Sequence, residues 1–492
     1  MKKVAIIGGG IAGMTAGVLL QKNGFHTEVF EKNAVPGGQC TGWKREGYFI
    51  DNCIHWLTGT REGSALHELW KEIGALGDGV EVHKKEMFFS SKLNGQTLTF
   101  WRDKERTRQE MLALSPEDEE EIHKLIKYVE LAESMTVPVE KPFDAMNLLD
   151  LMKMGMSMKE MGQVMKEYGN MDIGELAMRF RHPLIQRAIS DYMPSGYQAY
   201  AFLVSYATVT GENGDIPKGG SLAMAMRIAD KYKEYGGVLH TNAAVKKILL
   251  NKKKAEGILL ENGTKVSADY IVCACDTDFT FRKLLPETSM PKQLRKQYEE
   301  RDKYPVNSGF QIAYAVDGRF PEITGTRVFA CEEMEAGKHT VKAMSVQAYD
   351  YEPDFAPEGK MILQSNFEQT EEDYRYWEKL YIDKGAYHQK KSEIAQQAMT
   401  RLIAEYPCLK GKIRILDVWT PMTYTRYCNS YKGAYMSFVT TKQAKSITVP
   451  GTIKGLRNVM LASQWLMGPG GLPTAAAMGK FAAWRIMKGE GK

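Results

Sequence analysis

The stretch that decides the fold is VAIIGGGIAGMTAGVLLQKNGFHTEVFEK, residues 4–32. It opens with a β-branched apolar run, Val4–Ile7, which is typical of a strand buried on both faces. Gly8, Gly10 and Gly13 follow with the spacing GxGxxG and begin a helical pattern that ends near Gly24. Glycines here allow a tight turn, a close approach to a pyrophosphate and close packing of helix on sheet. The stretch therefore predicts a βαβ unit whose helix N-terminus binds the phosphates of a dinucleotide.

A carboxylate closes this unit. Glu31 follows the second apolar run, TEVF, and lies roughly 20 residues after the glycines, where an acid accepts hydrogen bonds from a ribose 2′-hydroxyl. The same charge repels a 2′-phosphate, which disfavours NADP. A glycine-rich turn in an ordinary α/β core is the alternative, but it explains neither Glu31 nor the register of the glycines.

Composition excludes several classes of protein. A chain of 492 residues predicts two or three domains, and 43% hydrophobic and 25% charged residues are ordinary for a globular protein. The net charge of +5 is small, and the longest basic run is NKKK at 251–254, so we expect no nucleic-acid partner. No apolar run reaches the ~20 residues of a membrane-spanning helix.

The cysteines indicate the compartment. Seven are scattered without CxxC or zinc-ligand spacing, which predicts no metal site and a reduced, cytoplasmic location. Because the first strand begins directly after MKK, we expect no signal peptide.

Further glycine-rich and small-residue motifs recur along the chain. They are PGGQCTG (36–42), PKGGS (217–221), GGVLHTNAAVKKI (236–248), ADYIVCACD (268–276), TPMTYTRY (420–427) and GPGGLPTAAAMGKFAA (468–483). With the opening glycines and Glu31, they make the chain resemble, over essentially its whole length, a group of amine-oxidase-like flavoproteins. This group comprises the FAD-dependent phytoene desaturases, carotenoid isomerases and retinol saturases.

The resemblance implies noncovalent FAD and a set of cofactor-binding residues. The pyrophosphate is expected at Gly8, Gly10, Ala12 and Gly13, and the adenosine ribose at Glu31 with the adjacent Lys32. The phosphate and ribityl region is expected along Gly38 and Gln39, and adenine at the backbone of Val245. The ribityl chain and the pyrimidine edge of the flavin are expected along Gln464, Gly471 and Leu472.

Two positions depart from the family pattern. Many relatives carry Arg where this chain has Gln39, and Gly-Asp or Gly-Ala where it has Ser463-Gln464. These changes remove charges near the cofactor, so a specific activity does not transfer from the resemblance. Cys428, the last cysteine, precedes the closing motif, which favours noncovalent flavin. No second strand–GxGxxG–helix unit indicates a nicotinamide domain.

The motifs also predict the domain organisation, because the cofactor segments lie at the start, the middle and the end. The expected fold is α/β: a discontinuous Rossmann-like FAD-binding domain (1–75, 215–285 and 445–492) and a mixed α+β substrate-binding domain with a helical lid (76–214 and 286–444).

Two residues are candidates for catalysis. His55 follows a segment that the family places beside the flavin, where an imidazole can transfer protons; a structural histidine bonded to backbone is the alternative. Tyr427 belongs to a group of aromatic residues late in each insertion, some of which line the family's cavity and some of which are expected in the core.

A methionine-rich stretch, 146–165, has two interpretations. Methionine is flexible and suits adaptable apolar surfaces, so the stretch predicts a lid or a membrane-facing entrance for an apolar substrate. Loosely packed helical core, or compositional bias in a chain with 28 Met, is the alternative.

The leading functional hypothesis is an FAD-dependent oxidoreductase acting on a hydrophobic unsaturated small molecule. It desaturates, saturates or isomerises a carbon–carbon double bond by hydride exchange at flavin N5. A flavin amine oxidase and a noncatalytic FAD-stabilised lipid or polyene carrier are the alternatives. Peripheral membrane contact is compatible with the sequence, and the oligomeric state is left open.

Overall fold

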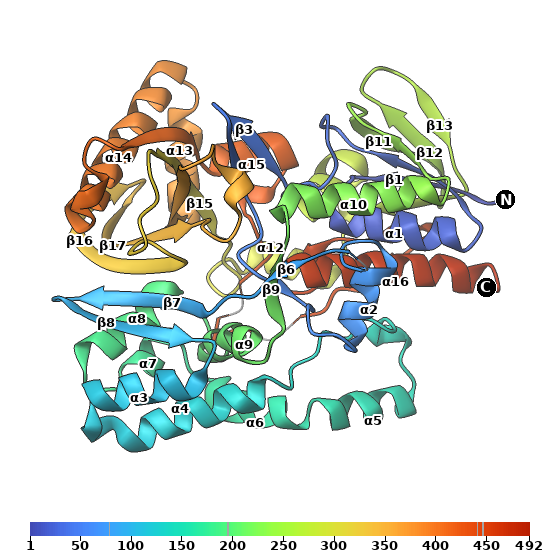
Figure 1. The fold of residues 1–492 in the computed structure, drawn as a ribbon. Coiled ribbons are helices and arrows are strands. Elements are labelled where there is room, and N and C mark those ends of the chain that lie inside the picture. The colour runs from blue at the N-terminus through green and yellow to red at the C-terminus, as the bar shows by residue number, and fades with distance from the viewer. Residues whose placement is uncertain (78, 194–195, 440, 445–446) are drawn as a thin grey trace.

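The computed structural model describes residues 1–77, 79–193, 196–439, 441–444 and 447–492. Figure 1 shows a parallel sheet with its helices on the right, a larger sheet on the left, and helices of the first insertion in a layer along the bottom. The predicted class, α/β with a Rossmann-like unit and a mixed α+β part with a helical layer, is confirmed.

A six-stranded sheet carries the opening βαβ unit. β1 lies at its centre with β2 and β14 as parallel neighbours, and the run predicted as a buried strand is buried from Val4 to Ile7. Only β20, at one edge, is antiparallel. The order across the sheet is β10 (Val238–His240), β2 (His26–Phe30), β1 (Lys3–Ile7), β14 (Tyr270–Cys273), β21 (Leu456–Leu461) and β20 (Thr452–Ile453).

Helix α1 (Ile11–Lys22) is enclosed between this sheet and two other helices, α10 (Gly220–Glu234) and α16 (Leu472–Gly489). A Cβ on Gly13 would lie 2.0 Å from the Gly8 carbonyl oxygen, and one on Gly479 of α16 would lie 2.3 Å from the Ala12 carbonyl oxygen. Both distances are far inside van der Waals contact, so only glycine permits these approaches. As a result, α1 is buried from Ile11 to Leu20.

A seven-stranded sheet unites the two insertions. It is antiparallel except where β7 pairs with β16 in parallel, which joins the first insertion to the second. The order is β19 (Ile413–Trp419), β15 (Ser308–Val316), β18 (Met361–Gln369), β17 (His339–Ala348), β16 (Thr326–Ala336), β7 (Met87–Leu93) and β8 (Gln96–Trp101).

Smaller sheets connect these parts. Turns after Asn251 and at Asn262–Gly263 join the strands of a three-stranded sheet. The strands of these sheets are β11 (Val245–Asn251), β12 (Lys254–Leu260) and β13 (Lys265–Ser267); β3 (Gly42–Arg45) and β4 (Tyr48–Asp51); and β5 (Leu57–Thr58), β9 (Gly214–Pro217) and β6 (Val82–His83).

Helices cover both sheets. Those of the first insertion are α3 (Lys104–Leu114), α4 (Glu119–Ala132), α5 (Leu148–Ser157), α6 (Lys159–Tyr168), α7 (Ile173–Ala177), α8 (Pro183–Tyr192) and α9 (Ala199–Thr210). The others are α2 (Ala65–Glu72), α11 (Thr277–Phe279), α12 (Lys292–Glu299), α13 (Glu371–Leu380), α14 (Lys384–Glu405) and α15 (Pro421–Cys428).

The two large sheets draw their strands from the segments expected for the two domains. The six-stranded sheet uses residues from 1–75, 215–285 and the C-terminal segment, and the seven-stranded sheet uses 76–214 and 286–444. The expected boundary at 444/445 meets residues 445–446, which lie outside the described residues. Within the part of the chain that the structure describes, no helix is long and apolar enough to span a membrane.

We expect Gly479→Ala to lower the free energy of unfolding by about 1–3 kcal/mol, because the added methyl group forces α1 and α16 apart. Thermal or urea unfolding measures the effect. Gly162→Ala in α6 is the control: a Cβ there meets no atom within 4 Å, so it should leave stability unchanged or raise it by up to about 1 kcal/mol. Equal stability of the two variants would contradict the packing argument.

Candidate functional site

One large cavity lies between the two sheets and the helical layer. Its volume is about 1520 Å³, against roughly 300–1,000 Å³ for a site that holds one small molecule. All the candidate cofactor residues except Gly13, and both catalytic candidates, line it. The cavity has room for a cofactor and for a second molecule beside it.

Two helices begin at this cavity with free backbone N–H groups. Gly10 precedes α1 and Gly471 precedes α16, and no side chain caps the first turn of either helix. Ala12 of α1 and Leu472 and Thr474 of α16 line the cavity. The positive ends of two helix dipoles therefore face the same volume, an arrangement that favours anionic or carbonyl oxygen atoms of a ligand.

The third long helix of this unit, α10, does not offer its N-terminus to a ligand, because a protein side chain already binds there. Asp51 accepts a hydrogen bond from the backbone N–H of Ser221 in the first turn of α10 (2.9 Å). Asp51 is buried, which raises its pKa to about 7. The protein thus supplies its own acceptor at α10 and leaves α1 and α16 for a ligand.

The glycines at α1 divide into two roles. Gly8 has φ +104° and a Cβ there would lie 2.9 Å from the Ala274 carbonyl oxygen, so it makes the turn off β1. A Cβ on Gly10 would meet nothing closer than 3.9 Å, so this position is open to the cavity. Gly13 does not line the cavity; its part is the close packing of α1 described above, rather than contact with a ligand.

The carboxylate of Glu31 is fixed at the edge of the cavity by three hydrogen bonds. One carboxylate oxygen accepts from the Gly9 N–H (2.8 Å), and the other accepts from both nitrogens of Asn33 (2.8 Å each). The side chain is buried, yet it borders the cavity. The oxygen that accepts from Gly9 keeps a lone pair, so the group can still accept a hydrogen bond from a sugar hydroxyl.

Lys32, Val245 and Tyr427 lie near Glu31. The Lys32 ammonium group donates to the Arg426 carbonyl oxygen (2.8 Å), and the Tyr427 carbonyl oxygen accepts from the Asn33 amide (3.0 Å). Burial lowers the pKa of Lys32. Val245 begins β11, two residues after Ala243, whose N–H donates to the Glu31 carbonyl oxygen (2.8 Å). Tyr427, half-exposed, thus belongs to the Glu31 end of the cavity.

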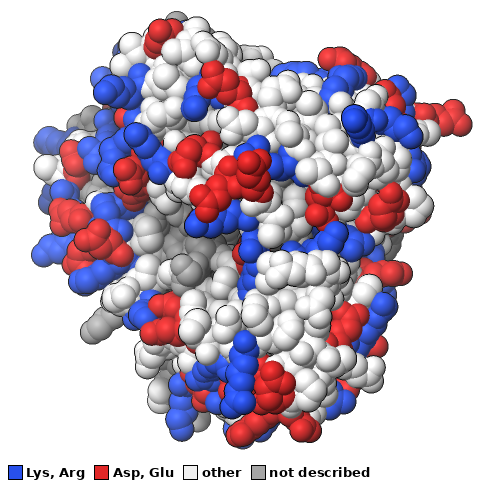
Figure 2. All heavy atoms as spheres, turned by 90° about the vertical axis from the view of Figure 1, so that its left-hand side faces the viewer, with Lys and Arg blue, Asp and Glu red and all other residues white. Residues whose placement is uncertain are grey.

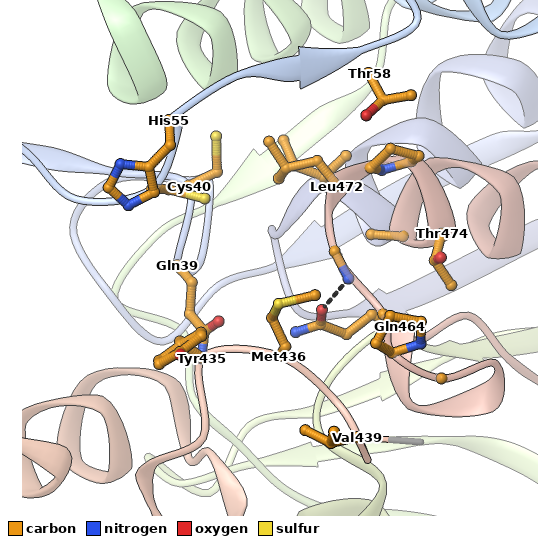
Figure 3. Close-up of a pocket in the computed structure, with 18 of the residues that line it drawn as sticks. Gln39, Cys40, His55, Thr58, Tyr435, Met436, Val439, Gln464, Leu472 and Thr474 are labelled. Carbon is orange, nitrogen blue, oxygen red and sulfur yellow. Dashed lines mark hydrogen bonds between the residues drawn. The ribbon is translucent and has the colours of Figure 1, made fainter. Parts of the chain in front are cut away.

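Two glutamines replace charged residues at the other end, shown in Figure 3. Gln39 donates to the Ala434 carbonyl oxygen (2.8 Å) and fixes the loop that carries Tyr435. Gln464 accepts from the Gly471 N–H (2.7 Å) and fixes the turn into α16. The two departures from the family pattern therefore stabilise loops around the cavity without adding charge to it.

His55 lies beside Cys40 in Figure 3 and points into the cavity. Its surface is accessible from the cavity, but protein surrounds it, and this burial together with Lys85 lowers its pKa to about 4. The imidazole is therefore neutral at neutral pH, and it is a weak base.

The cavity has one apolar and one polar wall. Methionines of α5, α6 and the turn between them form the apolar wall: Met154, Met158, Met161 and Met165. The seven-stranded sheet forms the polar wall, with Gln311, Ser345, Gln347, Gln364, Asn366 and Glu368. The aromatic residues late in each insertion are divided. Five of them line the cavity: Tyr192, Tyr197, Tyr200, Tyr424 and Tyr427. Three do not: Tyr206, Trp419 and Tyr431.

The described residues contain no cluster of three or more His, Cys, Asp or Glu side chains placed to hold a metal ion. Figure 2 shows a face on which basic and acidic groups are interspersed, and which is hollowed near its middle.

The site fits FAD: an open glycine turn and an uncapped helix suit the pyrophosphate, and a second uncapped helix suits the flavin end. Fold and site define the class, an FAD-dependent oxidoreductase. The chain belongs to the flavin-containing amine oxidoreductase family, whose sequence profile matches residues 11–487.

Individual relatives are distant. A 4,4'-diaponeurosporene oxygenase of Staphylococcus haemolyticus (strain JCSC1435) is 24% identical, with 99% of this chain and 97% of the relative covered. Among solved structures, an oxidoreductase from Methanosarcina mazei is 17% identical with a TM-score of 0.61, covering 99% of this chain and 100% of the other. The cyclohexylamine oxidase of Brevibacterium oxydans IH-35A is 15% identical with a TM-score of 0.59, and both chains are fully covered. The two structures share the fold.

The second glycine pair, part of the motif PGGQCTG, also shapes the site. Gly37 has φ +116° and its N–H donates to the Gly9 carbonyl oxygen (2.8 Å), which brings the second glycine pair against the first. The sequence did not predict Glu368 and Asn366 as site residues. In MILQSNFEQ (361–369) the many polar residues after Leu363 indicate that this part of the strand is not ordinary apolar core, but they do not indicate that it lines the site.

We expect Glu31→Ala to weaken FAD binding about 10–100-fold, because it removes a charged acceptor for the ribose. Titration of the deflavinated protein with FAD, followed by flavin fluorescence, measures this change. Glu358→Ala, at an exposed glutamate remote from the cavity lining, is the control and should bind FAD like the wild type. Unchanged affinity in Glu31→Ala would remove Glu31 from the cofactor site.

Proposed function

We propose that this oxidoreductase acts on a hydrophobic unsaturated substrate and desaturates, saturates or isomerises a carbon–carbon double bond, as in the phytoene desaturase, carotenoid isomerase and retinol saturase group. The cavity carries the proposal, because one continuous volume joins both helix N-termini to a methionine-lined apolar extension. A relative that matches along its whole length is named for oxygenation of diaponeurosporene, a polyene, which supports the same class of substrate.

The chain's own residues divide the work of binding. The N–H groups at the start of α1, with Gly8, Gly10 and Ala12, hold the pyrophosphate, while Glu31 binds the adenosine ribose. The start of α16, with Leu472, holds the pyrimidine edge of the flavin through its positive dipole end. Bound FAD supplies hydride exchange at N5, the chemistry that a change of carbon–carbon unsaturation requires.

The remaining lining positions the substrate. Methionine side chains adapt to a long apolar chain and exclude water from it. His55, neutral because of its lowered pKa, is a weak base and a poor proton donor at neutral pH, so its part is to shape the cavity beside the substrate. We propose that Tyr427 does not take part in the reaction, because its carbonyl oxygen accepts a hydrogen bond from Asn33 beside Glu31, at the ribose end of the cavity.

Anaerobic titration of the FAD-loaded protein tests the function. We expect an isoprenoid polyene to change the flavin absorbance, bleaching it if the enzyme desaturates, or to reoxidise chemically reduced flavin if the enzyme saturates. For isomerisation, chromatography of the polyene after incubation shows the new isomer. Cyclohexylamine and putrescine serve as amine controls. Bleaching by an amine but no reaction with any polyene would overturn the proposal in favour of amine oxidation.

We also propose that the substrate enters from a lipid surface at α5. None of the ten residues of this helix is buried. Leu148, Leu149, Met152 and Met156 are 74%, 68%, 56% and 76% exposed, an unusual concentration of apolar surface for a protein in water. A loosely packed core does not describe α5, because the helix packs into no core.

The spacing on α5 and α6 supports a bilayer as the partner. Residues 149, 152 and 156 repeat at helical spacing on the outward stripe, while 154, 158, 161 and 165 repeat toward the cavity. Lys153, Lys159 and Lys166 are exposed around the outward stripe and suit anionic lipid headgroups. An apolar substrate dissolved in the membrane could pass between these helices without crossing water.

We expect the double variant Leu149→Glu/Met156→Glu to lower binding to phosphatidylcholine vesicles containing phosphatidylglycerol at least about tenfold, from the apolar area that it removes. Co-sedimentation of the FAD-loaded protein measures the bound fraction. Ile382→Glu, at an 85% exposed position between α13 and α14, is the matched control and should bind like the wild type. Equal binding by both variants would contradict a role for α5.

A further inference from the structure

The polar wall of the cavity contains a carboxylate, Glu368, that forms no ion pair with a described residue. Glu368 lies on β18 and faces the cavity. Its one hydrogen-bond partner among the described residues is the side-chain amide of Asn307. No lysine, arginine or histidine of the described chain lies within ion-pair distance of it; His339, nearby, is bound to Asp373 (3.1 Å). Burial raises the pKa of Glu368 to about 7.

The register of the sheet places polar side chains around this carboxylate. Glu368 is paired with Gly309 of β15, which has no side chain of its own. The side chains of Asn366 and Gln311 lie over this glycine instead: a Cβ on Gly309 would lie 2.5 Å from the Asn366 side-chain oxygen and 3.1 Å from the Gln311 side-chain nitrogen. We call this part of the cavity lining, where Glu368, Asn366 and Gln311 meet, the recess.

Unused hydrogen-bonding groups converge on the recess. The Asn366 side-chain oxygen is buried and has no hydrogen-bond partner. Asn307 uses one amide nitrogen to donate both to Glu368 and to the Tyr197 hydroxyl oxygen (2.6 Å). Because that oxygen accepts from Asn307, the Tyr197 hydroxyl hydrogen is free for a ligand. Buried groups of this kind normally have partners, which points to a ligand that supplies them.

The mixture of groups discriminates between ligands. A hydroxyl group donates one hydrogen bond, which Glu368 or Asn366 can accept, and it accepts the hydrogen of Tyr197. A hydrocarbon leaves all of them unsatisfied, at a cost in binding. An ammonium group suits Glu368 but has no lone pair for Tyr197. The recess is therefore complementary to a hydroxyl group.

We propose that Glu368, Asn366 and Tyr197 form a subsite for a hydroxyl group, so that the substrate is a long-chain unsaturated alcohol with its chain along the methionine wall and its hydroxyl in this recess. This inference rests on the proposed function, because it specifies the substrate of the same cavity. Glu368 and Tyr197 are then specificity-determining residues, separate from the groups that hold FAD.

Ligand binding to the FAD-loaded protein tests the subsite. The probes are geranylgeraniol, the hydrocarbon with hydrogen in place of its hydroxyl group, and geranylgeranylamine, and the readout is quenching of tryptophan fluorescence. We expect the wild type to bind the alcohol about 10–100-fold more tightly than the hydrocarbon, as a hydrogen bond to a charged group allows. Glu368→Leu should remove most of this preference.

Tyr197→Phe removes a single hydroxyl group and serves if Glu368→Leu does not fold. It should weaken binding of the alcohol about 5–10-fold, as loss of one hydrogen bond allows, and leave the hydrocarbon unaffected. Tyr376→Phe is the control, because Tyr376 lies on α13 and does not line the cavity. It should bind all three probes like the wild type.

Two results would overturn the subsite. Equal affinity of the wild type for alcohol and hydrocarbon would show that the recess does not select a hydroxyl group. Tightest binding of the amine, lost in Glu368→Leu, would assign the recess to an ammonium group instead. Both are binding measurements, so they are distinguishable from failure of the proposed function, which is judged by the reaction of the flavin with unsaturated compounds.

Discussion

The close approach of three backbones at α1 is the constraint on which the rest of the structure depends. Gly13 lets α1 lie against the turn that leaves β1, and Gly479 lets α16 lie against α1. Because neither approach tolerates a side chain, α16 is held in one position relative to the opening βαβ unit. Its N-terminus, more than four hundred residues along the chain from that of α1, therefore opens into the same cavity.

That convergence determines how charge is arranged in the site. Two uncapped helix ends supply positive potential without positive side chains, while Asp51 occupies the corresponding end of α10. The glutamines at 39 and 464 bind backbone, so the cavity gains no charge at these two positions and the helix dipoles act there instead. A site of this kind holds its donors in fixed positions and needs little rearrangement when a ligand binds.

The two insertions form chemically different walls of the cavity. The sheet of the second insertion buries apolar residues against α13 and α14 and turns amides and Glu368 toward the cavity, which is the ordinary two-faced behaviour of an alternating strand. The first insertion presents methionines from α5 and α6. A ligand between these walls meets a polar face and an apolar face, and the methionine helices also carry apolar side chains toward the outside.

The sequence by itself determined the opening βαβ unit and indicated a dinucleotide cofactor, because glycine spacing, a buried strand and a closing carboxylate are local features with few alternative explanations. FAD and the candidate cofactor residues were predicted from the resemblance of its further motifs to a family of flavoproteins. The sequence also placed methionines at 146–165. Only the tertiary structure decided that Gly13 packs a helix and does not line the cavity, that Tyr427 lies near Glu31, that His55 is neutral, and that Glu368 forms no ion pair with a described residue. These properties depend on which distant segments share one enclosed volume, because burial and the choice of partners are set by long-range packing and leave no trace in local spacing.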